Sequence, residues 1–184
     1  MDIAAIIFDC DGVLVNSEAL GVEVERRALA RVGLEYEYHE FLTRFTGLAD
    51  ADLVESADTE RRKRLGAGLP ADFVQALNDE KQRLFSTALK AIDGVIALVE
   101  SIAIPKAVAS SATSAELIDK LRFTGLHHLF EPHIYSTELV EAGKPAPDIY
   151  FFAAGKLRCV PAQCLVIEDS VNGVRAGVAA GMTV

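Results

Sequence analysis

The chain has 184 residues, 51% of them hydrophobic, and a formal net charge of −9. This length and apolar content allow one compact core with room for a small insertion. The acidic balance excludes a general affinity for nucleic acid, although a small anionic substrate responds to local rather than net charge. Because the three cysteines form no disulfide framework and no leading apolar run could span a bilayer, we expect a cytoplasmic protein without a secretion signal or membrane segment.

A short apolar run over residues 4–8 predicts a buried strand that ends at Phe8, and Asp9 and Asp11 follow it directly. In an open parallel α/β sheet, ligands bind just beyond the carboxyl ends of the strands. Two carboxylates at that place can hold a hard divalent cation, and one can attack a substrate while the other moves protons. An ordinary turn is the alternative, because Asp and Gly are common turn residues.

The sequence predicts that residues 17–90 form a wholly helical region. Leu20, Val24, Ala28 and Val32 recur at i, i+4 spacing, which indicates one buried helix face. Ser17 is the expected N-cap of that helix. The helices are expected over residues 17–32, 39–45, 50–65 and 70–89, with Pro70 at a first helical position.

Strands and helices alternate after residue 94. Strands are expected over residues 104–109, 133–135 and 165–167, and helices over 95–102, 113–123, 148–157 and 171–180. Such alternation indicates a parallel sheet flanked by helices, so the fold class is α/β. The predicted organisation is a core domain of residues 1–15 and 91–184, with a helical domain of residues 16–90 inserted between the first two strands.

Polar residues stand at the ends of the expected strands or just before one, and should therefore gather at one edge of the sheet. In-line attack on a phosphate monoester requires neutralisation of its equatorial oxygens, which a metal ion, a lysine and a hydroxyl can supply. The set predicts a site for a phosphate monoester and Mg²⁺. In chain order, its members are Asp9 and Asp11, Ser110, Lys144 within a Gly-Lys-Pro-Ala-Pro segment, and Glu168 and Asp169.

Four motifs at these positions are together highly specific. They are Asp9-Cys10-Asp11-Gly12-Val13-Leu14, Ala107-Val108-Ala109-Ser110, Gly143-Lys144-Pro145-Ala146-Pro147-Asp148 and Ile167-Glu168-Asp169-Ser170-Val171-Asn172-Gly173. Through them, and over essentially its whole length, the sequence resembles the haloacid dehalogenase (HAD) superfamily of phosphohydrolases. The resemblance is to the helical-cap branch, near its β-phosphoglucomutase-like and phosphogluconate-phosphatase-like groups.

The resemblance implies a Rossmann-like parallel sheet core with an inserted helical cap, and it implies a role for each site residue. A carboxylate is a weak nucleophile, so the attacking group needs the positive charge of Mg²⁺ and of the lysine beside it. The implied roles are Asp9 as the nucleophile that forms an aspartyl-phosphate, Asp11 as general acid and base, Ser110 and Lys144 as phosphate-binding residues, and Asp9, Asp11 through its backbone carbonyl, Glu168 and Asp169 as the Mg²⁺ ligands.

The resemblance further implies a Mg²⁺-dependent phosphatase of small phosphorylated metabolites, with sugar phosphates as the expected substrates. A phosphosugar mutase is the alternative, and a non-catalytic binding protein is a third hypothesis. Mutase members carry a histidine in the first cap helix and an arginine after the glycine of the cap loop, where this chain has Gly21 and Asp50. Dehalogenase members lack the second aspartate, which is present here as Asp11.

Two residues of the expected cap are candidates for substrate contacts, Arg44 and Gly47. Arg44 is equally consistent with an ordinary surface arginine. The expected partner is a small phosphorylated metabolite, with neither nucleic acid nor membrane, and the expected state is a monomer. Members of the family usually continue with another strand and helix, whereas this sequence stops at Val184.

Other phosphate chemistries are disfavoured by spacing. A cysteine phosphatase needs an arginine six residues after its cysteine, and the residue six positions after Cys10 is Asn16. A P-loop needs Ser or Thr after Gly-Lys, whereas Pro145 follows Lys144. The four histidines show no spacing typical of a zinc site.

Overall fold

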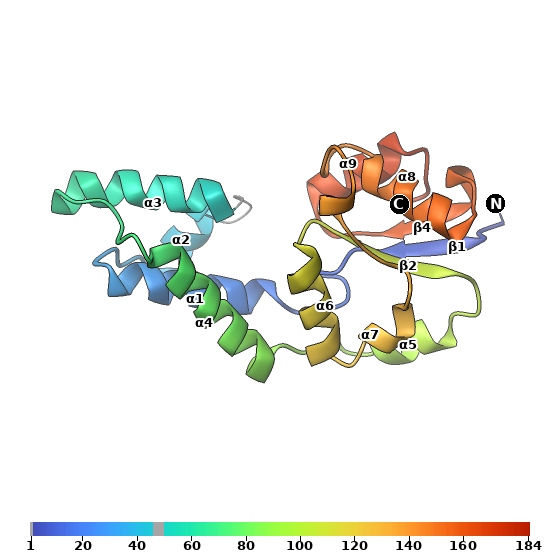
Figure 1. Cartoon of the computed structure of the whole chain (residues 1–184), viewed down its shortest axis with the longest axis horizontal. Helices are drawn as coiled ribbons and strands as arrows, with labels where there is room; N and C mark the ends of the chain where they lie inside the picture. Colours follow the sequence, from blue (N-terminus) through green and yellow to red (C-terminus); the bar gives the residue numbers. More distant parts are fainter. Residues whose placement is uncertain (1, 46–49) are drawn as a thin grey trace. The chain divides into compact units, whose positions relative to one another are not determined.

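The computed structural model describes residues 2–45 and 50–184, without the side chains of residues 50 and 51. The chain forms two compact units (Figure 1). The core unit comprises the residues up to Ser17 together with Leu89–Val184, and the inserted unit comprises Glu18–Ala88. Among the described residues, none of the helices combines the length and the apolar composition that crossing a bilayer requires.

The core unit is built on a parallel sheet, which confirms the predicted α/β class. In the described residues its strands are β1 (Ala5–Phe8), β2 (Lys106–Ser110), β3 (Ile134–Ser136) and β4 (Cys164–Ile167), in the order β3-β2-β1-β4. Ile7 pairs with Ala107 of β2 on one side and with Val166 of β4 on the other. The strand nearest the N-terminus, β1, therefore has a neighbour on each side. Both neighbours, β2 and β4, follow the inserted unit in the sequence.

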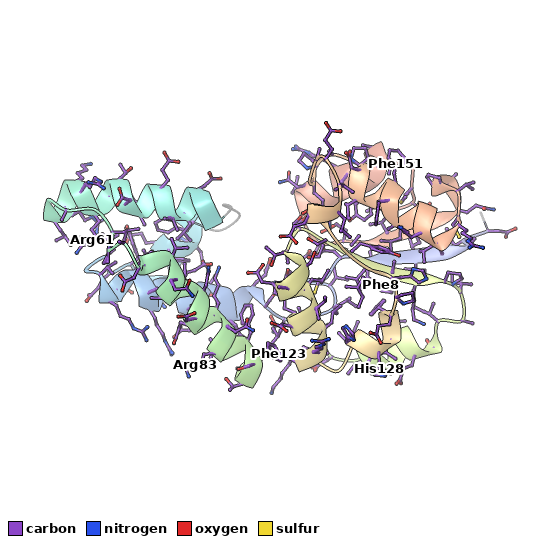
Figure 2. All side chains as sticks on the ribbon, viewed as in Figure 1. Phe8, Arg61, Arg83, Phe123, His128 and Phe151 are labelled. Atoms are coloured by element: carbon purple, nitrogen blue, oxygen red, sulfur yellow. The ribbon has the colours of Figure 1, made fainter. Side chains whose placement is uncertain are left out.

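Helices cover both faces of this sheet (Figure 1). One face carries α8 (Asp148–Leu157) and α9 (Val171–Ala179), and the other carries α5 (Val95–Ser101), α6 (Ser114–Phe123) and α7 (His127–Phe130). Ala5 and Ile7 belong to the apolar cluster that includes residues of α8 and α9. Phe8 instead packs edge-on against Phe130 of α7, with ring centroids 5.7 Å apart. Figure 2 shows Phe8 among the side chains of the core unit and Phe151 on the outer side of α8.

Most boundaries agree with the sequence predictions, and the exceptions have physical reasons. The strand expected from residue 104 begins at Lys106, because Pro105 has no N–H to contribute to the ladder and only its carbonyl accepts, from Ile6. The one-turn helix α7 was not predicted, since four residues are too few to show a helical period. Short 3₁₀ turns at Thr137–Leu139 and Pro161–Gln163 complete the described elements of the core unit.

The inserted unit consists, in its described residues, of α1 (Glu18–Arg31), α2 (Tyr38–Phe45), α3 (Asp50–Leu65) and α4 (Phe73–Ala88). All four predicted helices are present. Val24 and Ala28 are buried as the i, i+4 pattern predicts, in a cluster that also includes Phe41 and Phe73. The start predicted at Pro70 is wrong by three residues, because the Pro70 carbonyl accepts the Phe73 N–H in a turn that precedes α4. Arg61, labelled in Figure 2, donates its Nε–H to the Val32 carbonyl at 2.9 Å.

Candidate active site

The carboxyl ends of β1, β2 and β4 place four of the predicted site residues at one edge of the sheet. Asp9 follows β1 directly, Ser110 is the last residue of β2, and Glu168 and Asp169 follow β4. The Asp9 N–H donates to the Ile167 carbonyl at 2.9 Å, which continues the pairing of β1 with β4 for one more residue. Asp9 is only 7% exposed, so its carboxylate lies in a largely dry environment.

Lys144 joins this edge from the segment that precedes α8. Its Nζ donates to Asp9 Oδ1 at 2.6 Å and to Glu168 Oε2 at 2.7 Å. The lysine side chain is 3% exposed, so this ammonium is buried together with both of its carboxylate partners. A turn closed by the Ala146 N–H and the Gly143 carbonyl at 2.9 Å shapes the backbone on either side of the lysine. The predicted proximity of Asp9 and Lys144 is therefore present in the structure.

Glu168 is held by four hydrogen bonds. Its Oε2 accepts from Lys144 and from the Tyr150 hydroxyl at 2.6 Å, and its Oε1 accepts from the Ser170 N–H at 3.1 Å and from the Ser170 hydroxyl at 2.8 Å. Burial raises the pKa of Glu168, but the neighbouring Lys144 ammonium and these hydrogen bonds outweigh it and hold the pKa below its ordinary value. Glu168 is therefore a carboxylate at neutral pH, and it fixes the lysine beside Asp9.

Asp9, Glu168 and Asp169 each place one carboxylate oxygen within 4.8 Å of the oxygens of the other two. Such a set of hard oxygen donors suits a divalent cation such as Mg²⁺. Gly12 leaves room for the Asp169 carboxylate, because a Cβ on residue 12 would lie 1.8 Å from Asp169 Oδ2. The φ of +74° at this position also favours glycine. The residues present therefore fit the cation that the sequence predicts.

Asp11 is bound by a different set of groups. Its two carboxylate oxygens accept from the Lys120 ammonium of α6 at 2.6 Å and 2.8 Å, and Oδ1 also accepts from the Ser17 hydroxyl. The Asp11 carboxylate is not part of the three-carboxylate group, and the role of its backbone carbonyl as a ligand stays a prediction. The Asp11 carboxylate is therefore held by Lys120 and Ser17, two residues after Asp9 along the chain.

Ser110 is 1% exposed, and its hydroxyl oxygen accepts the Ala112 N–H at 3.1 Å. Its expected contact with a phosphoryl group stays a prediction. Burial raises the pKa of the Cys10 thiol well above its ordinary value. A thiol in that state is a poor nucleophile, which agrees with the sequence argument against a cysteine phosphatase.

The two candidate substrate contacts of the inserted unit stay predictions. Arg44, in the last turn of α2, donates to Glu60 at 2.8 Å, and its guanidinium lies 5.4 Å from the centroid of the Tyr36 ring. These contacts within the inserted unit agree with the surface-arginine interpretation without testing a substrate contact. Gly47 lies outside the described residues, and the side chain of Asp50 is likewise not described.

Sequence reasoning missed two residues of this site, Tyr150 and Lys120. Tyr150 is fully buried, and its ring also lies 5.1 Å from the Lys144 ammonium. Its place in the first turn of α8 looks like that of any core residue. Lys120 is a single lysine near the end of a helix, with no motif around it. Only the packing of the two helices against the sheet shows what either side chain contacts.

The burial of Asp9 predicts how stability depends on pH when metal is removed. Burial raises its pKa to about 7, although the Lys144 ammonium acts in the opposite direction. An unfolded aspartate titrates near pH 3.9. Between these values the folded state binds more protons than the unfolded state, so the contribution of Asp9 to the free energy of unfolding falls as the pH rises. In urea titrations with a chelator, we expect wild type to lose on the order of 2–3 kcal/mol more than Asp9→Asn between pH 5 and pH 8. Equal losses in the two proteins would contradict the raised pKa.

Comparison with known proteins places this geometry in a family. The family model described as haloacid dehalogenase-like hydrolase matches residues 6–184. The chain is 30% identical to the 6-phosphogluconate phosphatase of Escherichia coli K12, over 99% of this chain and 81% of that protein. It is 32% identical to the phosphorylated carbohydrates phosphatase of Thermotoga maritima, over 97% and 82%. A solved HAD family hydrolase from Deinococcus radiodurans R1, with bound phosphate and sodium, matches with a TM-score of 0.81 and 35% identity, over 98% of this chain and 79% of that one.

Proposed function

Because the chain belongs to the haloacid dehalogenase-like hydrolase family, we propose that it is a Mg²⁺-dependent phosphatase of small phosphorylated metabolites, in particular sugar phosphates. The observation that carries the proposal is the buried Asp9 carboxylate with the Lys144 ammonium 2.6 Å away, at the ends of parallel strands. The similarity to a 6-phosphogluconate phosphatase of Escherichia coli and to a phosphorylated carbohydrates phosphatase of Thermotoga maritima supports the substrate class.

In the first step of the proposed mechanism, an Asp9 oxygen attacks the phosphorus of the ester. The bond from phosphorus to the ester oxygen breaks, and Asp11 donates a proton to the departing alcohol. Lys144 and Ser110 bind the phosphoryl oxygens as negative charge grows on them. In the second step, Asp11 takes a proton from water, which attacks the phosphorus and releases Asp9 and inorganic phosphate.

The oxygen donors of this site fit the cation of this mechanism. Asp9, Glu168, Asp169 and the backbone carbonyl of Asp11 would hold Mg²⁺, which supplies charge neutralisation for the phosphoryl oxygens when it is bound. Lys144 contributes a fixed positive charge in contact with both Asp9 and Glu168. Its second carboxylate partner, Glu168, keeps that ammonium in place when Asp9 turns toward a substrate.

The proposal predicts that water, and not a second sugar hydroxyl, accepts the phosphoryl group. A mutase must protect its aspartyl-phosphate from water until the sugar returns in its other orientation. The first helix of the inserted unit has Gly21 where mutases have a histidine, and glycine offers no side chain to engage Asp11.

We therefore expect release of inorganic phosphate from several sugar phosphates with little isomer formed. The measurement is a parallel assay of free phosphate and of glucose 6-phosphate made from β-glucose 1-phosphate. If glucose 6-phosphate formed faster than free phosphate, the mutase hypothesis would replace the phosphatase hypothesis. If the protein turned over neither that sugar phosphate nor an aryl phosphate, both enzyme hypotheses would be refuted. The hypothesis of a non-catalytic binding protein would then remain.

A further inference from the structure

Lys120 of α6 contacts the Asp11 carboxylate directly. Its Nζ lies 2.6 Å and 2.8 Å from the two oxygens of the carboxylate, so one ammonium binds both of them. The lysine side chain is 13% exposed and that of Asp11 is 33% exposed. Pairs that are fully exposed contribute about 0–1 kcal/mol and hold neither side chain firmly. This pair is partly shielded from water, and the Ser17 hydroxyl also donates to Asp11 Oδ1.

The helix that carries Lys120 is itself fixed at its start. The Thr113 hydroxyl accepts the Glu116 N–H, and the Glu116 side chain accepts the Thr113 N–H, which forms a capping box. Leu117 and Leu121 of the same helix are 1% and 0% exposed, and they anchor it in the core unit. The ammonium of Lys120 therefore reaches Asp11 from a capped and well-packed helix.

We propose that Lys120 is a positioning residue, which holds the Asp11 carboxyl group where it can exchange a proton with the leaving oxygen. The inference rests on the proposed phosphatase function. Lys120, Asp11 and Ser17 all belong to the core unit, so the placement of Asp11 is set within that unit. Lys120 acts through Asp11 and has no part in binding the phosphoryl group, which is the role assigned to Lys144 and Ser110.

This role has a consequence that simple damage to the fold does not share. The departure of a sugar alcohol needs a proton from Asp11, whereas 4-nitrophenolate is stable enough to leave without one. A variant that misplaces Asp11 should therefore discriminate between the two kinds of ester. A variant that disturbs the phosphate site or the fold should slow both alike.

The experiment compares kcat/KM for glucose 6-phosphate and for 4-nitrophenyl phosphate in wild type and in Lys120→Met. General acid catalysis contributes about 10²- to 10⁴-fold, and a misplaced acid should forfeit part of that factor. We expect Lys120→Met to lower kcat/KM about 10- to 100-fold for the sugar phosphate and by less than about 3-fold for the aryl phosphate. Lys120→Arg, which restores a cation able to bind both oxygens, should recover most of the loss.

The matched control is Lys156→Met, the same change at an exposed lysine of α8 whose ammonium lies 5.1 Å from the centroid of the Phe152 ring. It should leave both rates as they are. Equal losses on the two esters, or no loss on either, would overturn the role of Lys120. If Lys120→Met fails to fold, Lys120→Gln gives the same comparison. Wild type that hydrolyses neither ester would instead overturn the proposed function, and with it the inference.

Discussion

Replacing Asp9 by asparagine is expected to lower turnover of any phosphate ester by about 10⁴-fold or more. The amide has nearly the size of the carboxylate, but it is neutral and cannot form the aspartyl-phosphate. The fold should persist, because Lys144 keeps Glu168 as a partner at 2.7 Å. Burial also opposes the charge of Asp9, so its removal does not take away a stabilising ion.

The measurement pairs steady-state phosphate release with thermal unfolding followed by circular dichroism. Asp93→Asn is the matched control, since it makes the same change at an exposed residue before α5. That control should retain full activity. A folded Asp9→Asn protein that keeps substantial activity would refute Asp9 as the nucleophile and, with it, the covalent intermediate.

Removal of divalent metal is expected to abolish hydrolysis, and added Mg²⁺ should restore it. The oxygens of Asp9, Glu168 and Asp169 lie within 4.8 Å of one another, so a phosphate group meets concentrated negative charge there unless a cation offsets it. Asp169→Ala removes one donor without touching the nucleophile. We expect this variant to lose activity about 100-fold or more at a Mg²⁺ concentration that saturates wild type.

Binding can be measured apart from catalysis. A ligand that binds only the folded state stabilises it, by about 2.7 kcal/mol at a concentration 100 times its Kd. Mg²⁺ should therefore raise the Tm of wild type and of the control Asp93→Ala, and should raise the Tm of Asp169→Ala far less. Full activity of wild type in excess chelator, or an equal rise in Tm for all three proteins, would contradict the cation site.

The sequence predicted those features that depend on position along the chain. The ends of parallel strands meet at one edge, so Asp9, Ser110 and Asp169 could be grouped once the strands were recognised. Tyr150 and Lys120 could not be grouped in this way, because they stand within helices, in the first turn of α8 and the last turn of α6. Their contacts depend on how each helix is rotated and packed against the sheet. The hydrophobic pattern of the sequence does not determine where a single polar atom of a helix will lie.

The boundaries that differ are local. Pro70 fits the first position of a helix, yet the chain forms a turn there before α4 begins at Phe73. The proline ring fixes φ at residue 70, but it does not decide whether the next residues continue as a helix. The four residues of α7 are held by the packing of Phe130 against Phe8, a contact between segments far apart in the chain.

The central position of β1 has a consequence for synthesis of the protein. Ile7 finds its partners only at Ala107 and Val166, and at about 5–20 residues per second the second of them follows roughly 10–30 s later. Until then at least one edge of the apolar Ala-Ile-Ile-Phe segment is unpaired, a condition that favours aggregation. Asp9 and Asp11 follow this segment directly, and charges in that place oppose the stacking of nascent chains. We therefore expect the two aspartates that we propose for catalysis to protect the preceding strand as well, before the sheet exists.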